Sequence, residues 1–191
     1  EQPKAIRDTI SPRMKEGRVV LDDIRLTTDY IRSLSRIYVV ACGSAYYVGV
    51  QSKYIIEKLC QVPVEPVLAS EFRYADPVLG KDTLVLIISQ SGETADTLAA
   101  LREAKARGAR TLAIVNVVGS SIAKLADDVI YTWAGPEIAV ATTKAYSTQL
   151  AVVDLLALYI SQCLGTLPAE RYDQLYRQLQ SLPEMVEKVL A

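Results

Sequence analysis

Histidine is absent from this chain of 191 residues. The absence removes the commonest general base at neutral pH and the commonest metal ligand. Cysteine is scarce as well: Cys42, Cys60 and Cys163 are odd in number and far apart. This spacing fits reduced thiols in a cytoplasmic protein better than a disulfide framework or a zinc site. We accordingly expect neither a metal nor a cofactor.

An excess of charge of one sign and a long apolar run are also missing. The formal net charge is −1 with both signs interspersed, which gives no electrostatic reason to expect nucleic acid or an anionic membrane as a partner. The longest apolar stretch, 150–160, is too short to span a bilayer and contains Asp154, so it predicts a core helix. The chain opens on Glu1 without a secretory signal, which suggests a piece excised from a longer protein.

What the chain does contain is a regular alternation of strand-like and helix-like segments. Half of its residues are hydrophobic, enough for a substantial core. The alternation predicts an α/β fold, with a parallel sheet covered by helices on both faces. Pro63 and Pro66 confine the second strand to a sheet edge. The expected strands are 37–41, 62–67, 84–88, 111–115 and 129–132, and the expected helices are 44–60, 94–107, 120–125 and 142–164, with others before residue 35 and after residue 168.

The most informative segment is 84–94, where five apolar residues lead into Ser-Gln-Ser-Gly-Glu-Thr. The apolar run predicts a strand buried on both faces, and the loop that leaves it meets the N-terminus of the next helix. Free backbone N–H groups favour an anion there, and the hydroxyls of Ser89, Ser91 and Thr94 add neutral donors. Alternatively, Ser91 or Thr94 simply caps the helix. Because a cap needs only one hydroxyl, we interpret the loop as a phosphate site.

Other polar loops leave expected strands at the same edge of the sheet, where open α/β sheets bind ligands. They are Cys42-Gly43-Ser44-Ala45, 116–121 and 135–144. The chain lacks the three-glycine turn of dinucleotide-binding folds and the Gly-Lys-Ser/Thr of a P-loop. These exclusions favour a monophosphate held by hydroxyls and backbone amides without a metal. Four aspartates without metal-ligand spacing are interpreted as turn or solvent-facing residues: Asp76, Asp82, Asp127 and Asp128.

Three titratable residues beside these loops have open roles. Cys42 lies where a helix begins, which can activate a thiol, but without a histidine partner the favoured interpretation is a small buried residue near the ligand. Glu137 and Lys144 flank the last loop. Either residue can contact a sugar or form a surface ion pair, and the local sequence does not decide between the two.

Five segments, taken in order, resemble a known family. Together they resemble the first sugar-isomerase (SIS) domain of the glutamine:fructose-6-phosphate aminotransferases, and the resemblance covers nearly the whole chain. The Ser-Gln-Ser-Gly-Glu-Thr run occurs in SIS domains widely, whereas the other segments are typical of the aminotransferases. The resemblance implies a three-layer α/β/α sandwich with a five-stranded parallel sheet. The segments are Cys42-Gly43-Ser44, 69–74, 89–98, Gly119-Ser120-Ser121 and 137–145.

The resemblance also implies which residues bind the substrate, which is fructose 6-phosphate or glucosamine 6-phosphate. Two positions depart from the family pattern, since Ala45 and Thr142 stand where serine is usual. Ala45 leaves only its backbone N–H for the phosphate, and Thr142 adds a methyl group beside the sugar. The residues implied for the phosphate are Ser44, Ser89, Gln90, Ser91 and Thr94, and those implied for the sugar are Cys42, Gly43, Val140 and Thr142.

In this family the catalytic groups lie outside a segment of this kind. A glutaminase domain supplies ammonia, and the groups that isomerise the sugar come largely from a second SIS domain and a C-terminal loop. The resemblance therefore implies no catalytic residue in this chain, partner domains in a parent protein, and a homodimer. It also implies a helical extension at 1–35, a phosphosugar-binding SIS domain at 36–165, and a helical segment at 166–191 that leads to a second SIS domain absent from this chain.

Two other functions remain open at this point. A regulatory SIS module that senses a phosphosugar normally sits beside a DNA-binding domain or another partner, and nothing basic occurs here. A stand-alone aldose–ketose isomerase needs its own acid and base groups in the pocket. The aminotransferase-like segments favour a fragment, inactive by itself, of the enzyme that converts fructose 6-phosphate and glutamine to glucosamine 6-phosphate and glutamate.

Overall fold

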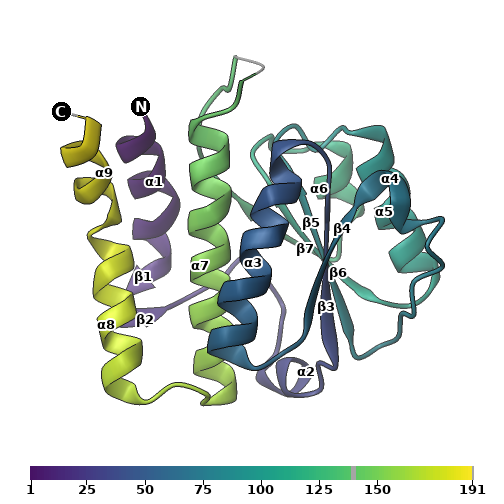
Figure 1. Ribbon diagram of the computed structural model, residues 1–191, viewed down its shortest axis with the longest axis horizontal. Helices are drawn as coiled ribbons and strands as arrows, with labels where there is room; N and C mark the ends of the chain where they lie inside the picture. The colour runs from purple at the N-terminus through teal and green to yellow at the C-terminus, as the bar shows by residue number, and fades with distance from the viewer. Residues whose placement is uncertain (139–140, 191) are drawn as a thin grey trace.

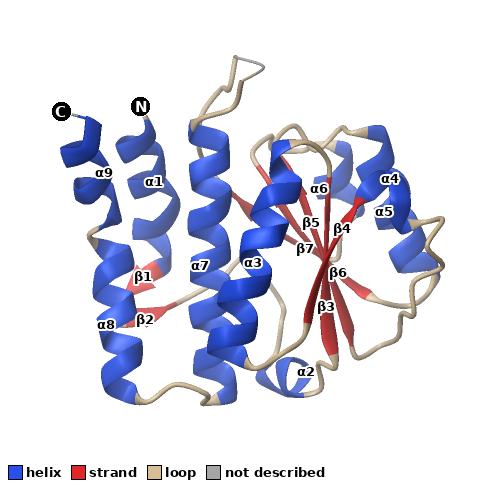
Figure 2. Cartoon of the chain, in the orientation of Figure 1, coloured by secondary structure: helices blue, strands red, loops and turns tan. Residues whose placement is uncertain are grey.

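A computed structural model describes residues 1–138 and 141–190 of the chain. The main sheet has five parallel strands in the order β4-β3-β5-β6-β7. It lies between α3 and α7 on one face and α4, α5 and α6 on the other (Figure 1). Helices cover both faces of the sheet, which confirms the predicted α/β class (Figure 2). β4, the strand that contains Pro66, pairs only with β3 and forms the predicted edge. The strands are β3 (Arg36–Ala41), β4 (Val64–Leu68), β5 (Thr83–Ser89), β6 (Arg110–Val115) and β7 (Asp128–Tyr131).

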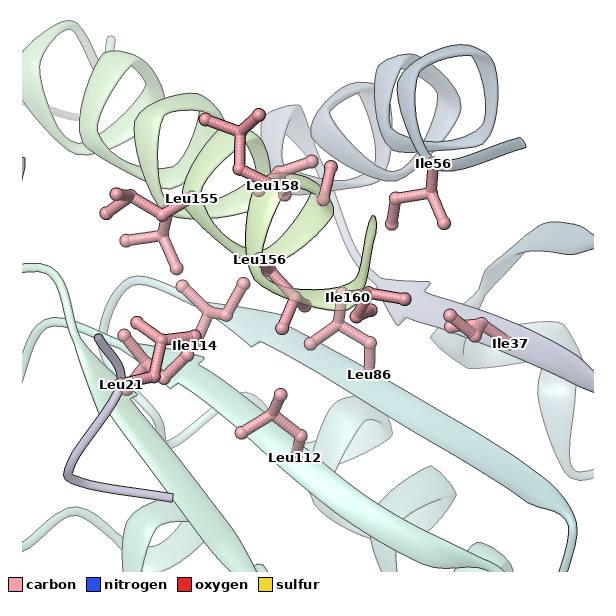
Figure 3. Close-up of a cluster of buried hydrophobic side chains, with 14 of the residues drawn as sticks. Leu21, Ile37, Ile56, Leu86, Leu112, Ile114, Leu155, Leu156, Leu158 and Ile160 are labelled. Atoms are coloured by element: carbon pink, nitrogen blue, oxygen red, sulfur yellow. The ribbon is translucent and has the colours of Figure 1, made fainter. Parts of the chain in front are cut away.

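The sheet separates two hydrophobic cores. Successive side chains of a strand point to opposite faces, so alternate residues of each strand enter different cores. Leu84, Leu86 and Ile88 of β5 pack toward α3 (Ser44–Cys60) and α7 (Lys144–Leu164). Figure 3 shows this core, in which side chains of α7 lie over those of the strands. Val85 and Ile87 of β5 face the opposite core, formed with α4 (Ala69–Phe72), α5 (Ala95–Ala106) and α6 (Ser121–Leu125).

α7 is long and apolar enough, by length and composition, to cross a membrane. It is longer than the apolar stretch 150–160 because less apolar residues at both ends are also helical. Within the molecule, however, 61% of its apolar window is buried. Its buried side chains pack on the sheet and on neighbouring helices, as the sequence predicts for a core helix (Figure 3).

An outer group of helices lies beyond α7 (Figure 1). It consists of α1 (Gln2–Ile10), α8 (Ala169–Gln180) and α9 (Leu182–Leu190). Arg13 lies in the turn that follows α1 and is buried, and its Nη2 donates to the Tyr131 carbonyl over 2.8 Å. α1 is thereby tied to the end of β7. A 3-10 turn (Ser11–Arg13), α2 (Thr28–Arg32) and a hairpin of β1 (Met14–Lys15) and β2 (Arg18–Val19) complete the chain.

The interpretation of Asp128 as a turn or solvent-facing residue is wrong. Its side chain is 1% exposed and accepts from Arg110 Nη2 over 2.8 Å, and the Arg25 backbone N–H donates to Oδ1 over 2.7 Å. Asp127 is half-buried and binds Lys105 and the Thr111 hydroxyl. These partners come from other elements of the fold, so the local sequence around the two aspartates does not reveal them.

Candidate functional site

The site is built on the carboxyl ends of β3 and β5, which are neighbours in the sheet. Ala41, the last residue of β3, is paired with Ile88 of β5. β3 leads through Gly43 into α3, and β5 leads through 90–94 into α5. Gly43 has φ 59° and ψ −138°, a conformation that favours glycine, and no side chain caps either helix. Two helix N-termini therefore converge with backbone N–H groups available for an anion.

A cavity of about 320 Å³ lies over these two N-termini. Hydroxyl, amide and backbone groups dominate its lining, and the only carboxylate in the described lining is that of Glu137. The described lining contains no lysine, arginine or histidine. An anion here would be held by neutral donors and by the dipoles of α3 and α5. The lining residues are Cys42, Gly43, Ser44, Ala45, Ile88, Ser89, Gln90, Ser91, Thr94, Thr97, Glu137, Thr142 and Gln149.

The hydroxyls of the loop after β5 do not cap α5. Ser89 Oγ accepts from the Gly92 N–H over 3.0 Å, and Ser91 Oγ accepts from the Glu93 N–H over 3.2 Å. Thr94 occupies the N-cap position of α5 but forms no side-chain cap bond, and its Oγ1 lies 3.4 Å from Ser89 Oγ. The backbone occupies acceptor sites of Ser89 and Ser91, so the Ser91 proton is available for another acceptor, and so is one proton of the Ser89–Thr94 pair, whichever of the two donates.

Gly92 and Glu93 attach this loop to α6. Gly92 has φ +68°, and a Cβ built there would lie 2.1 Å from the Ser120 Oγ. Its carbonyl accepts from the Ile122 N–H over 3.0 Å. Glu93 Oε1 accepts from the Ser121 N–H over 2.7 Å, and hydrogen bonding to Ser121 lowers the pKa of Glu93. Only glycine permits this close approach, so the loop is fixed in place before any ligand binds.

The loop before α7 also lines the cavity, through Glu137 and Thr142. Glu137 Oε2 accepts from the Ala145 N–H over 2.9 Å and from Thr142 Oγ1 over 3.3 Å. A carboxylate eight residues upstream thus caps α7 and holds Thr142 at the cavity. Gln149, in the second turn of α7, is buried with 3% exposure and also lines the cavity.

All the predicted site residues that the structure describes lie together in this cavity. Val140 falls outside the described residues. Thr97 and Gln149 were not predicted; Thr97 Oγ1 donates to Cys42 Sγ over 3.7 Å. The sequence signal for Thr97 is its place one helical turn after Thr94, and for Gln149 it is an amide within an apolar helix.

Two residues that the sequence left open or placed nearby lie outside this cavity. Lys144 pairs with Glu1 over 2.7 Å, which favours the ion-pair interpretation over a contact with the sugar. Asn116 lines a neighbouring groove together with Trp133 and Gly135. Among the described residues, no group of three or more histidine, cysteine, aspartate or glutamate side chains is placed to hold a metal ion.

The fold and the cavity define an α/β domain with a polar site at the carboxyl edge of its parallel sheet, and comparison gives the family. Residues 30–159 match the family model of the SIS domain, so this chain belongs to the SIS domain family. Over its full length the chain is 56% identical to the glutamine–fructose-6-phosphate aminotransferase [isomerizing] of Clostridium acetobutylicum and 48% identical to that of Mycolicibacterium smegmatis. It covers 32% and 30% of those proteins, so it spans about a third of the length of the curated relatives.

Solved structures give the same assignment. The whole chain superposes on the C-terminal domain of glucosamine-fructose-6-phosphate aminotransferase from Francisella tularensis, with a TM-score of 0.93, 37% identity and coverage of 54% of that chain. Glucosamine-6-phosphate deaminase from Thermotoga maritima matches 96% of this chain and 54% of its own with a TM-score of 0.66. At 22% identity, that second likeness concerns the fold alone.

Proposed function

We propose that this chain is the phosphosugar-binding part of a glutamine–fructose-6-phosphate aminotransferase. The observation that supports this most is the cavity over the N-termini of α3 and α5, where hydroxyls with available protons meet uncapped backbone N–H groups. Such a site suits a phosphate monoester, because it supplies many donors and no group that attacks phosphorus. Full-length similarity to aminotransferases supports the choice of fructose 6-phosphate or glucosamine 6-phosphate as its ligand.

Within the cavity we assign two ends. The phosphate end comprises the first turn of α3 and the loop after β5, and the sugar end comprises the residues that the resemblance assigns to the sugar. Cys42 is half-buried against Thr97 at the base, which suits a small packing residue beside the sugar better than a nucleophile. The phosphate end is Ser44, Ala45, Ser89, Gln90, Ser91 and Thr94, and the sugar end is Cys42, Gly43, Val140 and Thr142.

The parent protein supplies what this chain lacks. The proposed boundaries are a helical extension at 1–35, the SIS domain at 36–165 and a helical segment at 166–191 that continues to a second SIS domain. The proposed partners are that domain, a glutaminase domain and a second copy of the protein. The short coverage of the aminotransferase relatives supports such further domains. Three free cysteines favour the cytoplasm as its location.

We assign no catalytic acid or base to this chain. The described cavity contains one carboxylate, Glu137, and that group already accepts two hydrogen bonds from the start of α7. No second group in the described lining is suited to return a proton at neutral pH. We therefore propose that the chain binds the phosphosugar and that the acid and base groups come from elsewhere in the parent.

Calorimetric titration of the chain with fructose 6-phosphate, fructose and inorganic phosphate tests the proposal. The expected result is binding of fructose 6-phosphate, weaker binding of phosphate and negligible binding of fructose. A single-turnover assay with fructose 6-phosphate and ammonia should give no amino sugar and no aldose. Formation of an aldose phosphate would instead identify a stand-alone isomerase, and failure to bind either phosphorylated probe would contradict the proposal.

A further inference from the structure

The hydroxyls that line the cavity differ in whether their proton or only their lone pairs remain available to a ligand. A serine or threonine hydroxyl has one proton to donate and two lone pairs to accept with. The bonds that each hydroxyl makes inside the protein therefore decide which role remains for a ligand. A carboxylate, once ionised, only accepts.

On the side of the β5 loop, the protein uses lone pairs. Ser89 Oγ accepts from the Gly92 N–H and Ser91 Oγ accepts from the Glu93 N–H. Both backbone donors are fixed by the loop geometry. Ser91 keeps its proton, and of the two hydroxyls in the Ser89–Thr94 contact one proton is left for a ligand, whichever of them donates. This side is consequently a donor edge, which suits the oxygens of a phosphate.

At Glu137 and Thr142, which line the same cavity, the protein uses the proton instead. Thr142 Oγ1 donates to Glu137 Oε2 over 3.3 Å, and the same oxygen accepts from the Ala145 N–H over 2.9 Å. The backbone N–H can only donate, so Oε2 is held as an acceptor and the Thr142 proton is drawn toward it. Thr142 then offers the cavity lone pairs alone, and so does the carboxylate of Glu137.

We infer that Glu137 is a specificity-determining residue that makes this side an acceptor edge for sugar hydroxyls. It binds through its own oxygens, and it positions Thr142 by accepting the Thr142 proton. A phosphate placed against this edge meets only lone pairs and is repelled, whereas a sugar hydroxyl finds acceptors. The ligand is thus fixed in one direction, with phosphate at the β5 loop and hydroxyls at Glu137. The inference rests on the proposed function, since it concerns the same cavity.

Glu137→Gln is the decisive substitution. The amide oxygen still accepts from the Ala145 N–H and caps α7, but the amide nitrogen replaces an acceptor by a donor at the cavity. Affinity for fructose 6-phosphate should fall by about tenfold, since a hydrogen bond involving a charged group is lost, while affinity for inorganic phosphate should stay within about twofold. Both are measured by calorimetry, with the melting temperature recorded for each variant.

Further variants distinguish a role of Glu137 in orienting the ligand from a role in holding the loop before α7. Thr142→Val removes the hydroxyl and should reproduce the selective loss, whereas Thr142→Ser keeps it and should retain affinity. Glu57→Gln is the matched control, because Glu57 also binds a backbone N–H, that of Val64 over 2.9 Å, but does not line the cavity. It should change neither affinity.

The outcomes divide clearly. If Glu137→Gln and Thr142→Val weaken fructose 6-phosphate and inorganic phosphate equally, or weaken neither, Glu137 only supports the loop and the inference is overturned. If the unmodified chain binds neither probe, the proposed function itself fails and the inference fails with it. Selective loss of the sugar phosphate in both variants supports the assignment of an acceptor edge.

Discussion

Two cavities of nearly equal volume lie in this chain, and their linings are opposite in kind. The cavity at the carboxyl edge of the sheet, about 320 Å³, is lined by hydroxyls, amides and loop backbone. The other, about 290 Å³, lies among α3, α7, α8 and α9 and is lined by leucine, isoleucine and methionine side chains around Asp154 and Gln178. Because the two volumes are so similar, the proposed ligand site rests on the polar groups that the fold leaves available and not on volume.

The same comparison explains how differently the two regions are fixed. Around the first cavity, hydrogen bonds join the β5 loop to α6 and Glu137 to α7. Around the second, no described residue forms a hydrogen bond with Asp154, and burial alone raises the pKa of this carboxyl to about 6. The first region leaves hydrogen-bond donors available, which we propose for an anion, and the second tolerates a charge at a cost in stability.

The largest expected effect is that of Gly92→Ala, which breaks the organisation of the first cavity. The new Cβ would lie 2.1 Å from Ser120 Oγ at a residue with φ +68°. The free energy of unfolding should fall by about 3 kcal/mol, from backbone strain and overpacking together. Binding of fructose 6-phosphate should be lost, as measured by calorimetry under conditions where the variant is folded.

Gly108→Ala is the control for this substitution. Gly108 has φ +80°, but a Cβ there meets nothing within 4 Å, and the residue is far from the cavity lining. It should lose about 1 kcal/mol of stability and no affinity. An equally mild result for Gly92→Ala would mean that the loop is not held against Ser120.

The second effect concerns Asp154→Leu and should leave the first cavity untouched. Burial raises the pKa of Asp154 from 3.8 to about 6 in the folded protein. Below pH 3.8 the carboxyl is neutral in both the folded and the unfolded chain and costs no electrostatic free energy. The free energy of unfolding then falls as pH rises through 6, because the folded protein must bury the charged form. We therefore compare the free energy of unfolding of Asp154→Leu with that of the wild type at two pH values. The advantage of the variant should be about 2 kcal/mol larger at pH 8 than at pH 3.5.

Denaturant unfolding at the two pH values measures this difference, and affinity for fructose 6-phosphate should not change. Asp173→Leu, at an exposed position on α8, is the control and should have little effect on stability. A difference that is independent of pH would contradict the account of Asp154.

The smallest effect sharpens the description of the phosphate end. Ala45 lies in the first turn of α3 and lines the cavity. Ala45→Ser should strengthen binding of fructose 6-phosphate by roughly 1 kcal/mol, because a hydroxyl donor is added beside the phosphate. Calorimetry measures the change; unchanged or weaker affinity would mean that the α3 loop has packed around alanine.

The central strands and the position of the loop after β5 were predictable because their signals are local. An apolar run followed by hydroxyls and a glycine located β5 and the loop at Ser89, and prolines located the edge strand β4. The hairpin of β1 and β2 was missed because each strand has two residues, too few to show alternation. α4, with four residues, was missed for the same reason.

Other features depend on partners that lie far away in the sequence. Asp128 is buried because it pairs with Arg25 and Arg110, which lie elsewhere in the sequence. The contact of the Glu137 carboxylate with the Ala145 N–H likewise depends on the path of the loop between the two residues. α7 begins at Lys144 rather than at the predicted residue 142, and Glu137 is its cap. No pattern of hydrophobicity or propensity encodes such contacts, so the structure was needed to find them.

The most direct test of the central claim is the effect of Thr94→Val on ligand binding compared with stability. The Thr94 hydroxyl forms no cap bond, so its removal should leave the melting temperature unchanged and weaken fructose 6-phosphate by about 1–3 kcal/mol. Thr27→Val is the matched control: Thr27 Oγ1 caps α2 by accepting from the Tyr30 N–H over 3.2 Å, so this variant should lose about 1 kcal/mol of stability and no affinity. If Thr94→Val behaves like Thr27→Val, the loop at Ser89 is not a phosphate site.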